Sequence, residues 1–143
     1  MTVSAILQNK GTSIVTISPD VSLSEAVRSL AEHRIGAIVA VDAQARVAGI
    51  ISERDVVRIL GEKGPDVLSE PVSSVMTRTV VTCTTSETVP GVMERMTRGR
   101  FRHVPVVEDG RLLGIISIGD VVKFRVEEME RESAALRDYI MTA

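Results

Sequence analysis

The sequence predicts an α+β fold made of two copies of one unit, and two observations support this prediction. A motif that begins at Gly49 is repeated, with few changes, from Gly114 onwards. Around each copy of the motif, short apolar runs of strand length alternate with stretches in which apolar residues recur at helical spacing. Each copy is therefore expected to contain a strand, a helix, two strands and a second helix, in that order.

The repeat covers most of the chain. Its motif reads Gly49-Ile-Ile-Ser-Glu-Arg-Asp55-Val-Val-Arg58 in the first copy and Gly114-Ile-Ile-Ser-Ile-Gly-Asp120-Val-Val-Lys123 in the second. Upstream, the match continues to the apolar runs 14–16 and 80–82, with one unmatched residue near Gln44. A unit of about 55 residues buries only enough surface for marginal stability alone, so we expect the two copies to pack on one another.

The first copy is expected to begin with a strand at 14–16. Ser22 and Glu25 have the spacing of a capping box, which predicts a helix from Ser22 to about His33. The apolar runs 36–41 and 47–51 flank a polar turn and predict a hairpin of buried strands. A second helix follows directly, and the glycines and proline of 61–65 end it and begin a linker.

The second copy repeats this order with different helix signals. Thr88 takes the cap position of its first helix, and Pro90 lies in the first turn, where the missing N–H costs nothing. The runs 102–107 and 112–116 predict the second hairpin.

The last helix is expected to continue beyond the repeat. Its apolar residues recur at spacings of three, four and seven, and charged residues occupy the other face. These apolar residues are Val122, Val126, Met129, Leu136 and Ile140. A helix of roughly 20 residues with such a stripe has a second surface to cover, most simply the same helix of another subunit. A helix that folds back on its own core is the alternative.

Composition excludes several classes of protein. The chain has 143 residues, of which 44% are hydrophobic and 25% charged, as in globular domains. Only 2% are aromatic, too few for the stacking platforms that bind single-stranded nucleic acid. The net charge of −2 offers no general attraction to nucleic acid or to an anionic membrane surface. We therefore expect neither nucleic acid nor a membrane as a partner.

The cysteine and histidine content favours a cytoplasmic protein without a metal site. Cys83 is the single cysteine, so it forms no internal disulfide and is expected to be inert packing. No secretory leader opens the chain, and no apolar run approaches the roughly 20 residues of a membrane span. His33 and His103 lack partners at metal-ligand spacing, so no metal ligands are expected.

The repeated motif has two chemical interpretations. Ser52 and Asp55, like Ser117 and Asp120, follow a buried strand and lie in the first turn of a helix. A helix start favours phosphate oxygens, and a carboxylate there can accept both hydroxyls of a ribose. The same Ser-x-x-Asp spacing is also that of a capping box that closes the helix start. Spacing alone favours capping, and the two roles are compatible for the serines.

These residues resemble the signature of a pair of tandem cystathionine-β-synthase-type (CBS) domains, also called a Bateman module. The resemblance rests on the twin motif, the strands Arg34–Val41 and Phe101–Val107, and Val75-Met76-Thr77 at the start of the second copy. It implies two β-α-β-β-α units related by a pseudo-twofold axis and packed sheet to sheet. We expect CBS domains at 10–66 and 72–130, and a C-terminal helix extension at 131–143.

The resemblance also implies two clefts between the copies for adenosine-containing ligands. One cleft would combine Ser117 and Asp120 with Val15, Ile35 and Gly36. The other would combine Ser52 and Asp55 with Val81, Phe101 and Arg102. Because Gly36 leaves space beside the base, the Asp120 cleft is expected to be the roomier and to fill first. Phe101 either fills the other cleft or stacks on a base.

Arginine and histidine side chains near the clefts are candidates to bind phosphates. A guanidinium offers a planar fork that matches phosphate oxygens. We expect Arg54, Arg102 and His103 to contribute, and Arg34 and Arg100 to lie at the surface.

The predicted function is a non-catalytic regulatory module. No nucleophile, acid–base pair or metal cluster stands out, so no catalytic residues are expected. The resemblance implies an adenine nucleotide, AMP, ADP, ATP or NAD, as the ligand that reports energy or redox state, and the stripe implies a homodimer. The alternative is a ligand-free dimeric module that regulates a separately encoded partner protein.

Overall fold

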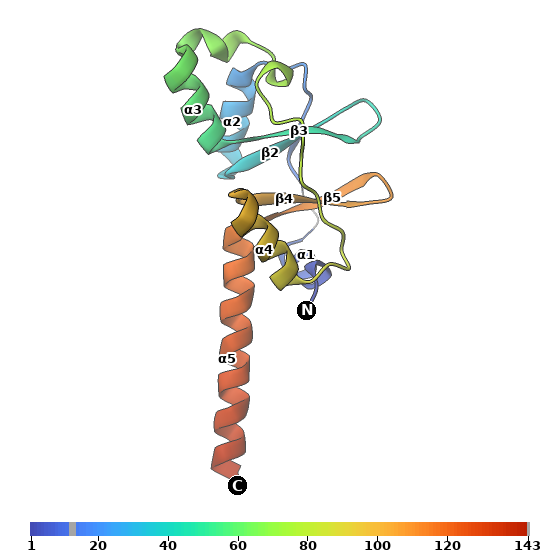
Figure 1. Ribbon diagram of the computed structural model, residues 1–143, viewed down its shortest axis with the longest axis vertical. Coiled ribbons are helices and arrows are strands. Elements are labelled where there is room, and N and C mark those ends of the chain that lie inside the picture. The colour runs from blue at the N-terminus through green and yellow to red at the C-terminus, as the bar shows by residue number, and fades with distance from the viewer. Residues whose placement is uncertain (12–13, 143) are drawn as a thin grey trace.

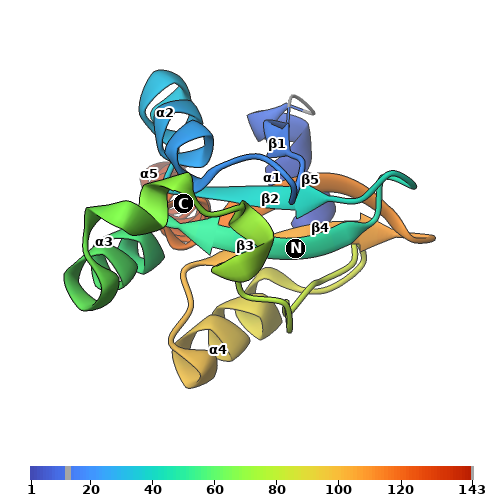
Figure 2. The same ribbon diagram turned by 90° about the horizontal axis from the view of Figure 1, so that it is seen from above.

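Two small β-sheets face each other at the centre of the molecule, and a long helix leaves one end (Figure 1). The structure is a computed structural model and describes residues 1–11 and 14–142. Seen from above, the helices lie around the outside of the two strand pairs (Figure 2). The predicted α+β class and the two stacked units are confirmed.

The first unit follows the predicted order. Its elements are β1 (Thr16–Ile17), α2 (Leu23–His33), β2 (Ala37–Val41), β3 (Val47–Ser52) and α3 (Glu53–Lys63). β1 pairs parallel with β2, and β2 pairs antiparallel with β3. Ser22 caps α2 as predicted, because its hydroxyl accepts a hydrogen bond from the Glu25 N–H.

The second unit contains α4 (Val89–Gly99), β4 (His103–Glu108), β5 (Arg111–Ser117) and α5 (Ile118–Thr142). The strand expected at 80–82 is absent, since here the backbone makes one isolated parallel bridge between Cys83 and Val106. If this pairing continued towards the N-terminus, the next backbone hydrogen bond would need the N–H of residue 105. That residue is a proline, which has no N–H. In the first unit, Val39 is the matching residue and pairs with Thr16.

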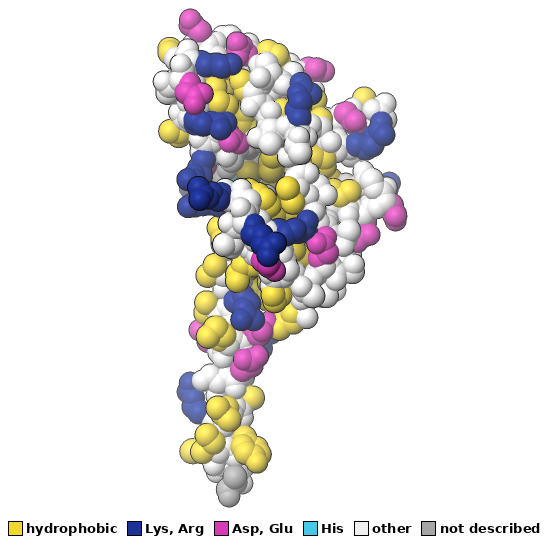
Figure 3. Space-filling view, in the orientation of Figure 1, with side chains coloured by type: hydrophobic (Ala, Val, Ile, Leu, Met, Phe, Trp, Pro, Cys, Tyr) yellow, Lys and Arg dark blue, Asp and Glu magenta, His cyan; other side chains and the backbone are white. Residues whose placement is uncertain are grey.

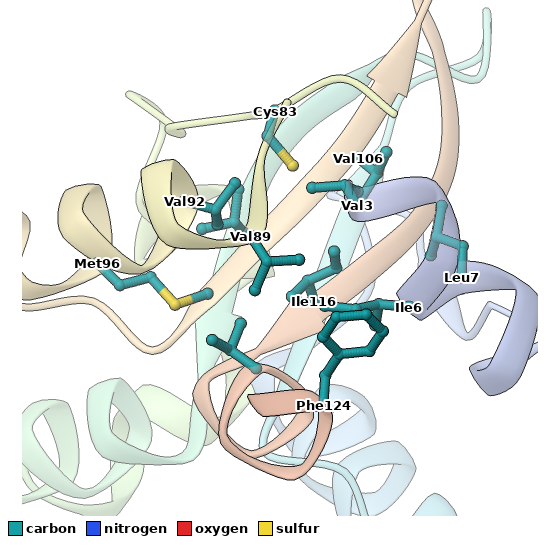
Figure 4. Close-up of a cluster of buried hydrophobic side chains, with 12 residues drawn as sticks. Val3, Ile6, Leu7, Cys83, Val89, Val92, Met96, Val106, Ile116 and Phe124 are labelled. Atoms are coloured by element: carbon teal, nitrogen blue, oxygen red, sulfur yellow. The ribbon is translucent and has the colours of Figure 1, made fainter. Parts of the chain in front are cut away.

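An N-terminal helix, α1 (Val3–Lys10), was not predicted. Although it precedes the first unit, it packs into the core of the second, where Val3, Ile6 and Leu7 are buried. Figure 4 shows Ile6 beside Ile116 and Phe124. The helix thus ties the start of the chain to its last unit.

The segment 71–76 covers the first unit in the way that 2–7 covers the second. This segment includes the short 3₁₀ helix Val72–Ser74, which follows another at Pro65–Ser69. A backbone bridge joins Thr2 to Thr88, which is the N-cap residue of α4. A second bridge joins Pro71 to Ser22, which is the N-cap residue of α2. The likeness was readable in the sequence, since Thr2-Val-Ser-Ala-Ile-Leu matches Pro71-Val-Ser-Ser-Val-Met.

Two glycines of the repeated motif allow these segments to lie close to the strands. A Cβ atom on Gly114 would come within 2.7 Å of Leu7 Cδ2, and one on Gly49 within 2.5 Å of Met76 Sδ. Any larger residue would push the covering segment off the strand. The motif therefore needs glycine for packing in both units.

The last helix extends well past the globular part (Figure 1). Val121 and Phe124 are buried against the second unit, whereas the side chains from 129 to 142 are exposed. The apolar stripe is exposed too, so the helix does not fold back on its own core. Among residues 1–11 and 14–142, no helix is long and apolar enough to span a membrane.

We expect Leu7→Ala to lower the free energy of unfolding by roughly 2–4 kcal/mol, because the substitution leaves a cavity over Gly114. Chemical denaturation of the full chain measures this loss. Met76→Ala, at the matching position over Gly49, is the control and should cost a similar amount. A neutral Leu7→Ala beside a destabilising Met76→Ala would show that α1 does not contribute to the core.

Candidate functional site

A cavity of about 690 Å³ lies between the two units. Its walls come from the starts of α3 and α5, from the segment that leads into the second unit and from the start of β4. The residues that line it are Gly36, Ile50, Ser52, Glu53, Arg54, Asp55, Arg58, Thr77, Thr79, Val80, Val81, Arg100, Phe101, Arg102, His103, Ser117, Ile118 and Gly119. The site thus belongs to both copies of the repeat.

The structure brings together every residue expected in the Asp55 cleft. Ser52, Asp55, Val81, Phe101 and Arg102 all line the cavity. The phosphate-binding candidates Arg54 and His103 line it as well.

The residues expected around Asp120 are dispersed. Ser117 and Gly36 line the large cavity, whereas Val15 and Ile35 pack against the core of the first unit. Asp120 lies in a separate depression of about 470 Å³ on the α1 side. The sequence-based grouping of these five residues therefore does not correspond to one cavity here.

Both Ser-x-x-Asp motifs form complete capping boxes. The Ser52 N–H donates to Asp55 Oδ2 at 2.9 Å, and the Asp55 N–H donates to Ser52 Oγ at 3.2 Å. Ser117 and Asp120 make the same pair of bonds at 2.9 and 3.1 Å. The capping interpretation is confirmed. The caps hold each carboxylate at the end of a strand, in a fixed position relative to the serine.

Asp55 keeps one carboxylate oxygen directed away from its cap. Oδ1 lies 3.4 Å from a guanidinium nitrogen of Arg58, an exposed ion pair that is weak in water. The Ser52 hydroxyl accepts one bond and still has a proton to donate. Asp55 and Ser52 can therefore accept and donate hydrogen bonds toward a molecule in the cavity.

Four arginines make the lining of the cavity cationic. Arg54, Arg58, Arg100 and Arg102 line it, against two acidic residues, Glu53 and Asp55. Such a lining suits a bound anion, above all one with phosphate oxygens.

Two further arginines line the cavity. Arg100, which ends α4 in a left-handed conformation with φ 57°, is exposed as expected and also lines the cavity. Arg58 was not considered, yet both copies of the motif carry a basic residue at this position, Arg58 and Lys123. This regularity was the available signal. Arg34 does not line the cavity, in agreement with its expected surface position.

Gly36 lines the cavity where a side chain would crowd His103. A Cβ atom on Gly36 would lie 3.1 Å from His103 Nε2 and 3.6 Å from Glu53 Oε1. Gly36 and Arg102 occupy equivalent positions in the two units. The carbonyl oxygen of Gly36 accepts a hydrogen bond from the first N–H of α3, and that of Arg102 accepts one from the first N–H of α5. Gly36 is therefore small where its counterpart is Arg102, and the expectation that it enlarges the Asp120 cleft stays a prediction.

Lys10 contacts Asp120. Its Nζ lies 2.7 Å from Asp120 Oδ2 and 2.8 Å from the Ile115 carbonyl oxygen. Partial burial on its own raises the pKa of Asp120, but hydrogen bonds from Lys10 and Ser117 outweigh it, so that the pKa lies below its ordinary value. Asp120 is thus an ion-paired carboxylate, unlike Asp55.

His103 lies partly buried in the cavity wall. Burial lowers the pKa of the imidazole below its ordinary value, and the Lys10 ammonium lowers it further, against the opposite effects of Glu53 and Asp120. A neutral ring in the cavity offers one donor and one acceptor. Phe101 lies beside it in the cavity wall, with its ring packed over Gly99.

Cys83 packs in the core of the second unit. Cys83 is buried, and burial raises the pKa of its thiol to about 11, which keeps it protonated and unreactive. In the described part of the chain, no group of three or more His, Cys, Asp or Glu side chains is arranged to hold a metal ion.

Fold and site together define a duplicated α+β module with a cationic cavity between its two units. The chain belongs to the CBS domain family, whose family model matches residues 5–62 and 72–127.

Comparison with known proteins agrees with this assignment. The mitochondrial CBS domain-containing protein CBSX3 of Arabidopsis thaliana is 36% identical over 97% of this chain and 71% of its own length. The crystal structure of the CBS-domain protein ATU1752 from Agrobacterium tumefaciens is 52% identical, with a TM-score of 0.84 over 87% of this chain and 92% of that one.

Two similar structures contain adenosine compounds. The CBS domain pair of protein MJ0100, in complex with 5-methylthioadenosine and S-adenosyl-L-methionine, is 27% identical, with a TM-score of 0.80 over 90% of this chain and 98% of that one. PAE2072 from Pyrobaculum aerophilum, complexed with AMP, is also 27% identical, with a TM-score of 0.75 over 84% of this chain and 89% of that one.

We predict that Lys10→Met raises the pKa of Asp120. The depressed pKa makes Asp120 stabilise the fold above its ordinary value of about 4, and this contribution is lost as the pH falls through the folded-state pKa. In the variant, stability should depend less on pH in this acidic range. An NMR titration of the side-chain carboxyl measures the pKa directly. Lys123→Met, which removes a charge from the same depression, is the control, and an unchanged pKa in Lys10→Met would contradict the role of Lys10.

Proposed function

We propose that this protein is a non-catalytic regulatory module that binds an adenosine-containing nucleotide in the cavity between its two units. The observation that carries the proposal is the juxtaposition, in one cavity, of a capped carboxylate and serine at a helix start with four arginine side chains. AMP, ADP, ATP and NAD all combine a ribose with phosphate groups. They fit this chemistry and would report the energy or redox state of the cell.

Each part of a nucleotide has a candidate partner in the cavity. The carboxylate of Asp55 would accept hydrogen bonds from the ribose hydroxyls. Arg54, Arg58, Arg100 and Arg102 would bind phosphate oxygens. The apolar side chains of Ile50, Val81 and Phe101 would enclose the base, with His103 as a neutral hydrogen-bonding group beside it.

The known ligands of similar proteins support the adenosine part of this proposal. AMP, S-adenosyl-L-methionine and 5-methylthioadenosine share an adenosine core but differ in charge and in the group at the 5′ position. The arginines that line the cavity favour the anionic members of this class, because a guanidinium gains most from a phosphate.

The two carboxylates of the repeat are proposed to differ in function. Asp55 is weakly paired, whereas Asp120 is bonded to Lys10 at 2.7 Å. A ribose at Asp120, beside Val15 and Ile35, would have to displace this ammonium group. We therefore expect the Asp55 cavity to fill first.

A ligand-free dimeric interaction module is the second candidate. The observation in its favour is the exposed apolar stripe of α5, which includes Met129, Leu136 and Ile140. Figure 3 shows hydrophobic side chains along the exposed length of this helix. In this case, a second copy of the chain and a separately encoded protein would be its partners. We propose the same homodimer for the nucleotide-binding module, so the two candidates differ only in the ligand.

A thermal denaturation screen with AMP, ADP, ATP, NAD and S-adenosylmethionine separates the two candidates. A ligand at 100 times its dissociation constant stabilises the folded state by about 2.7 kcal/mol, so the melting temperature should rise with at least one of the four phosphate-containing nucleotides. Adenosine is the control for the phosphate contacts and should have a smaller effect. A melting temperature that none of these compounds raises would leave the interaction module as the function.

We predict that Asp55→Ala weakens binding of the nucleotide found in this screen by roughly 10- to 150-fold, the value of a hydrogen bond to a charged group. Asp120→Ala is the matched control, because it removes the same capping box in the other unit. Each variant should lose about 1 kcal/mol of stability with its cap, and Asp120→Ala should lose more because it also removes the ion pair with Lys10. Only Asp55→Ala should lose affinity in calorimetry. If both variants bind the nucleotide as tightly as the unmodified chain does, Asp55 caps α3 and does not bind the ligand.

A further inference from the structure

The exposed stripe of α5 follows the spacing of a coiled coil. Positions 122, 126, 129, 133, 136 and 140 are separated by alternating steps of four and three residues. In heptad notation, Val126, Ser133 and Ile140 take the a positions, and Val122, Met129 and Leu136 take the d positions. The five apolar side chains are between 48% and 64% exposed, so they are open to a partner.

The charged residues beside the stripe are complementary between two parallel copies. In a parallel coiled coil, each g residue lies beside the e residue five positions later in the other helix. Arg125 would then lie beside Glu130 of the second copy, and Glu132 beside Arg137 of the second copy. Both of these contacts join opposite charges.

The antiparallel alignment would instead bring like charges together. If the two stripes overlap fully in opposite directions, Glu132 faces the same residue of the second copy, and so does Glu130. Lys123 would face Arg137. Like charges at such positions disfavour a pairing, so the charge pattern selects the parallel arrangement.

The globular part leaves this face of the helix free. Val121 and Phe124, which anchor α5 in the second unit, are buried, whereas Val122 and Val126 on the stripe are about half exposed. If two helices paired along the stripe, their globular parts would lie on opposite sides of the paired helices. Because α5 is already anchored in the fold, pairing also costs less conformational entropy than pairing of two free peptides.

We infer that α5 forms an in-register parallel coiled coil with the same helix of a second copy over residues 122–140. The inference deepens the dimer included in the proposed function and specifies the surface, the direction and the register of the pairing. Ser133 at a central a position makes the apolar seam discontinuous, so the flanking charges carry a large share of the specificity.

Exchange of the charges at 132 and 137 tests the direction of pairing. Neither Glu132 nor Arg137 has an ion-pair partner among the described residues of its own chain, whereas Arg125 pairs with Glu128 at 3.0 Å. Glu132→Arg should raise the dissociation constant of the full-length dimer by roughly tenfold, because two attractive contacts become repulsive. The double variant Glu132→Arg/Arg137→Glu should restore the dissociation constant to within about threefold of the original, since the opposite charges meet again.

Sedimentation equilibrium measures these dissociation constants, and Asp138→Arg is the matched control. It makes the same change of charge at an f position, on the outside of the coil, and should leave the dimer unchanged. Circular dichroism checks the helix. Glu132→Arg places an arginine four residues after Glu128, and such a pair of opposite charges stabilises a helix. The substitution should therefore not unfold α5, and a weaker dimer would reflect the contacts between the two copies.

A cysteine at a central position tests the register independently. Ser133→Cys should form a disulfide between two copies under mild oxidation, because identical a positions face each other only in a parallel, in-register pair. Ala134→Cys, outside the seam, is the control, and the buried Cys83 does not compete. A monomer at micromolar concentration, or a dimer that neither the charge exchange nor the cysteine affects, would overturn the coiled coil. Nucleotide binding by such a chain would still support the proposed ligand, so the two failures are distinguishable.

Discussion

A reciprocal pair of hydrogen bonds at the junction of strand and helix fixes the geometry on which the site depends. In the first unit, Ser52 and Asp55 bond to each other's backbone N–H groups, so that α3 begins directly where β3 ends. This cap satisfies donors that the helix start would otherwise leave unpaired. It also fixes a carboxylate and a hydroxyl in the wall of the cavity. One short motif thus serves helix formation and the proposed binding site.

The same motif has different surroundings in the two units, although its internal bonds are alike. The chain between Leu7 and Ile14 is longer than the matching stretch between Met76 and Val80, and it brings Lys10 to Asp120. The depressed pKa of Asp120 reflects this contact. Asp55 has only the weak ion pair with Arg58. The duplicated motif therefore carries two carboxylates with different partners, Lys10 for Asp120 and Arg58 for Asp55.

The helix α5 connects the cavity with the exposed stripe. Its first residues, Ile118 and Gly119, line the cavity, and Phe124 fixes it in the core of the second unit. Further along, the same rigid element carries the heptad positions that end at Ile140. A ligand in the cavity would contact the element that we infer to pair two copies. This continuity suits a module whose output is the arrangement of its subunits.

The sequence by itself determined the duplication, the helix caps and the type of chemistry at the motif, because these depend on residues close together in the chain. Ser52, Asp55, Val81, Phe101 and Arg102 were grouped correctly by the repeat and the family resemblance together. Only the tertiary structure decided that α1 covers the second unit, that Pro105 removes a predicted strand pairing and that Lys10 bonds to Asp120. Each of these contacts joins residues distant in sequence, and local spacing carries no information about which of many possible partners packing will select.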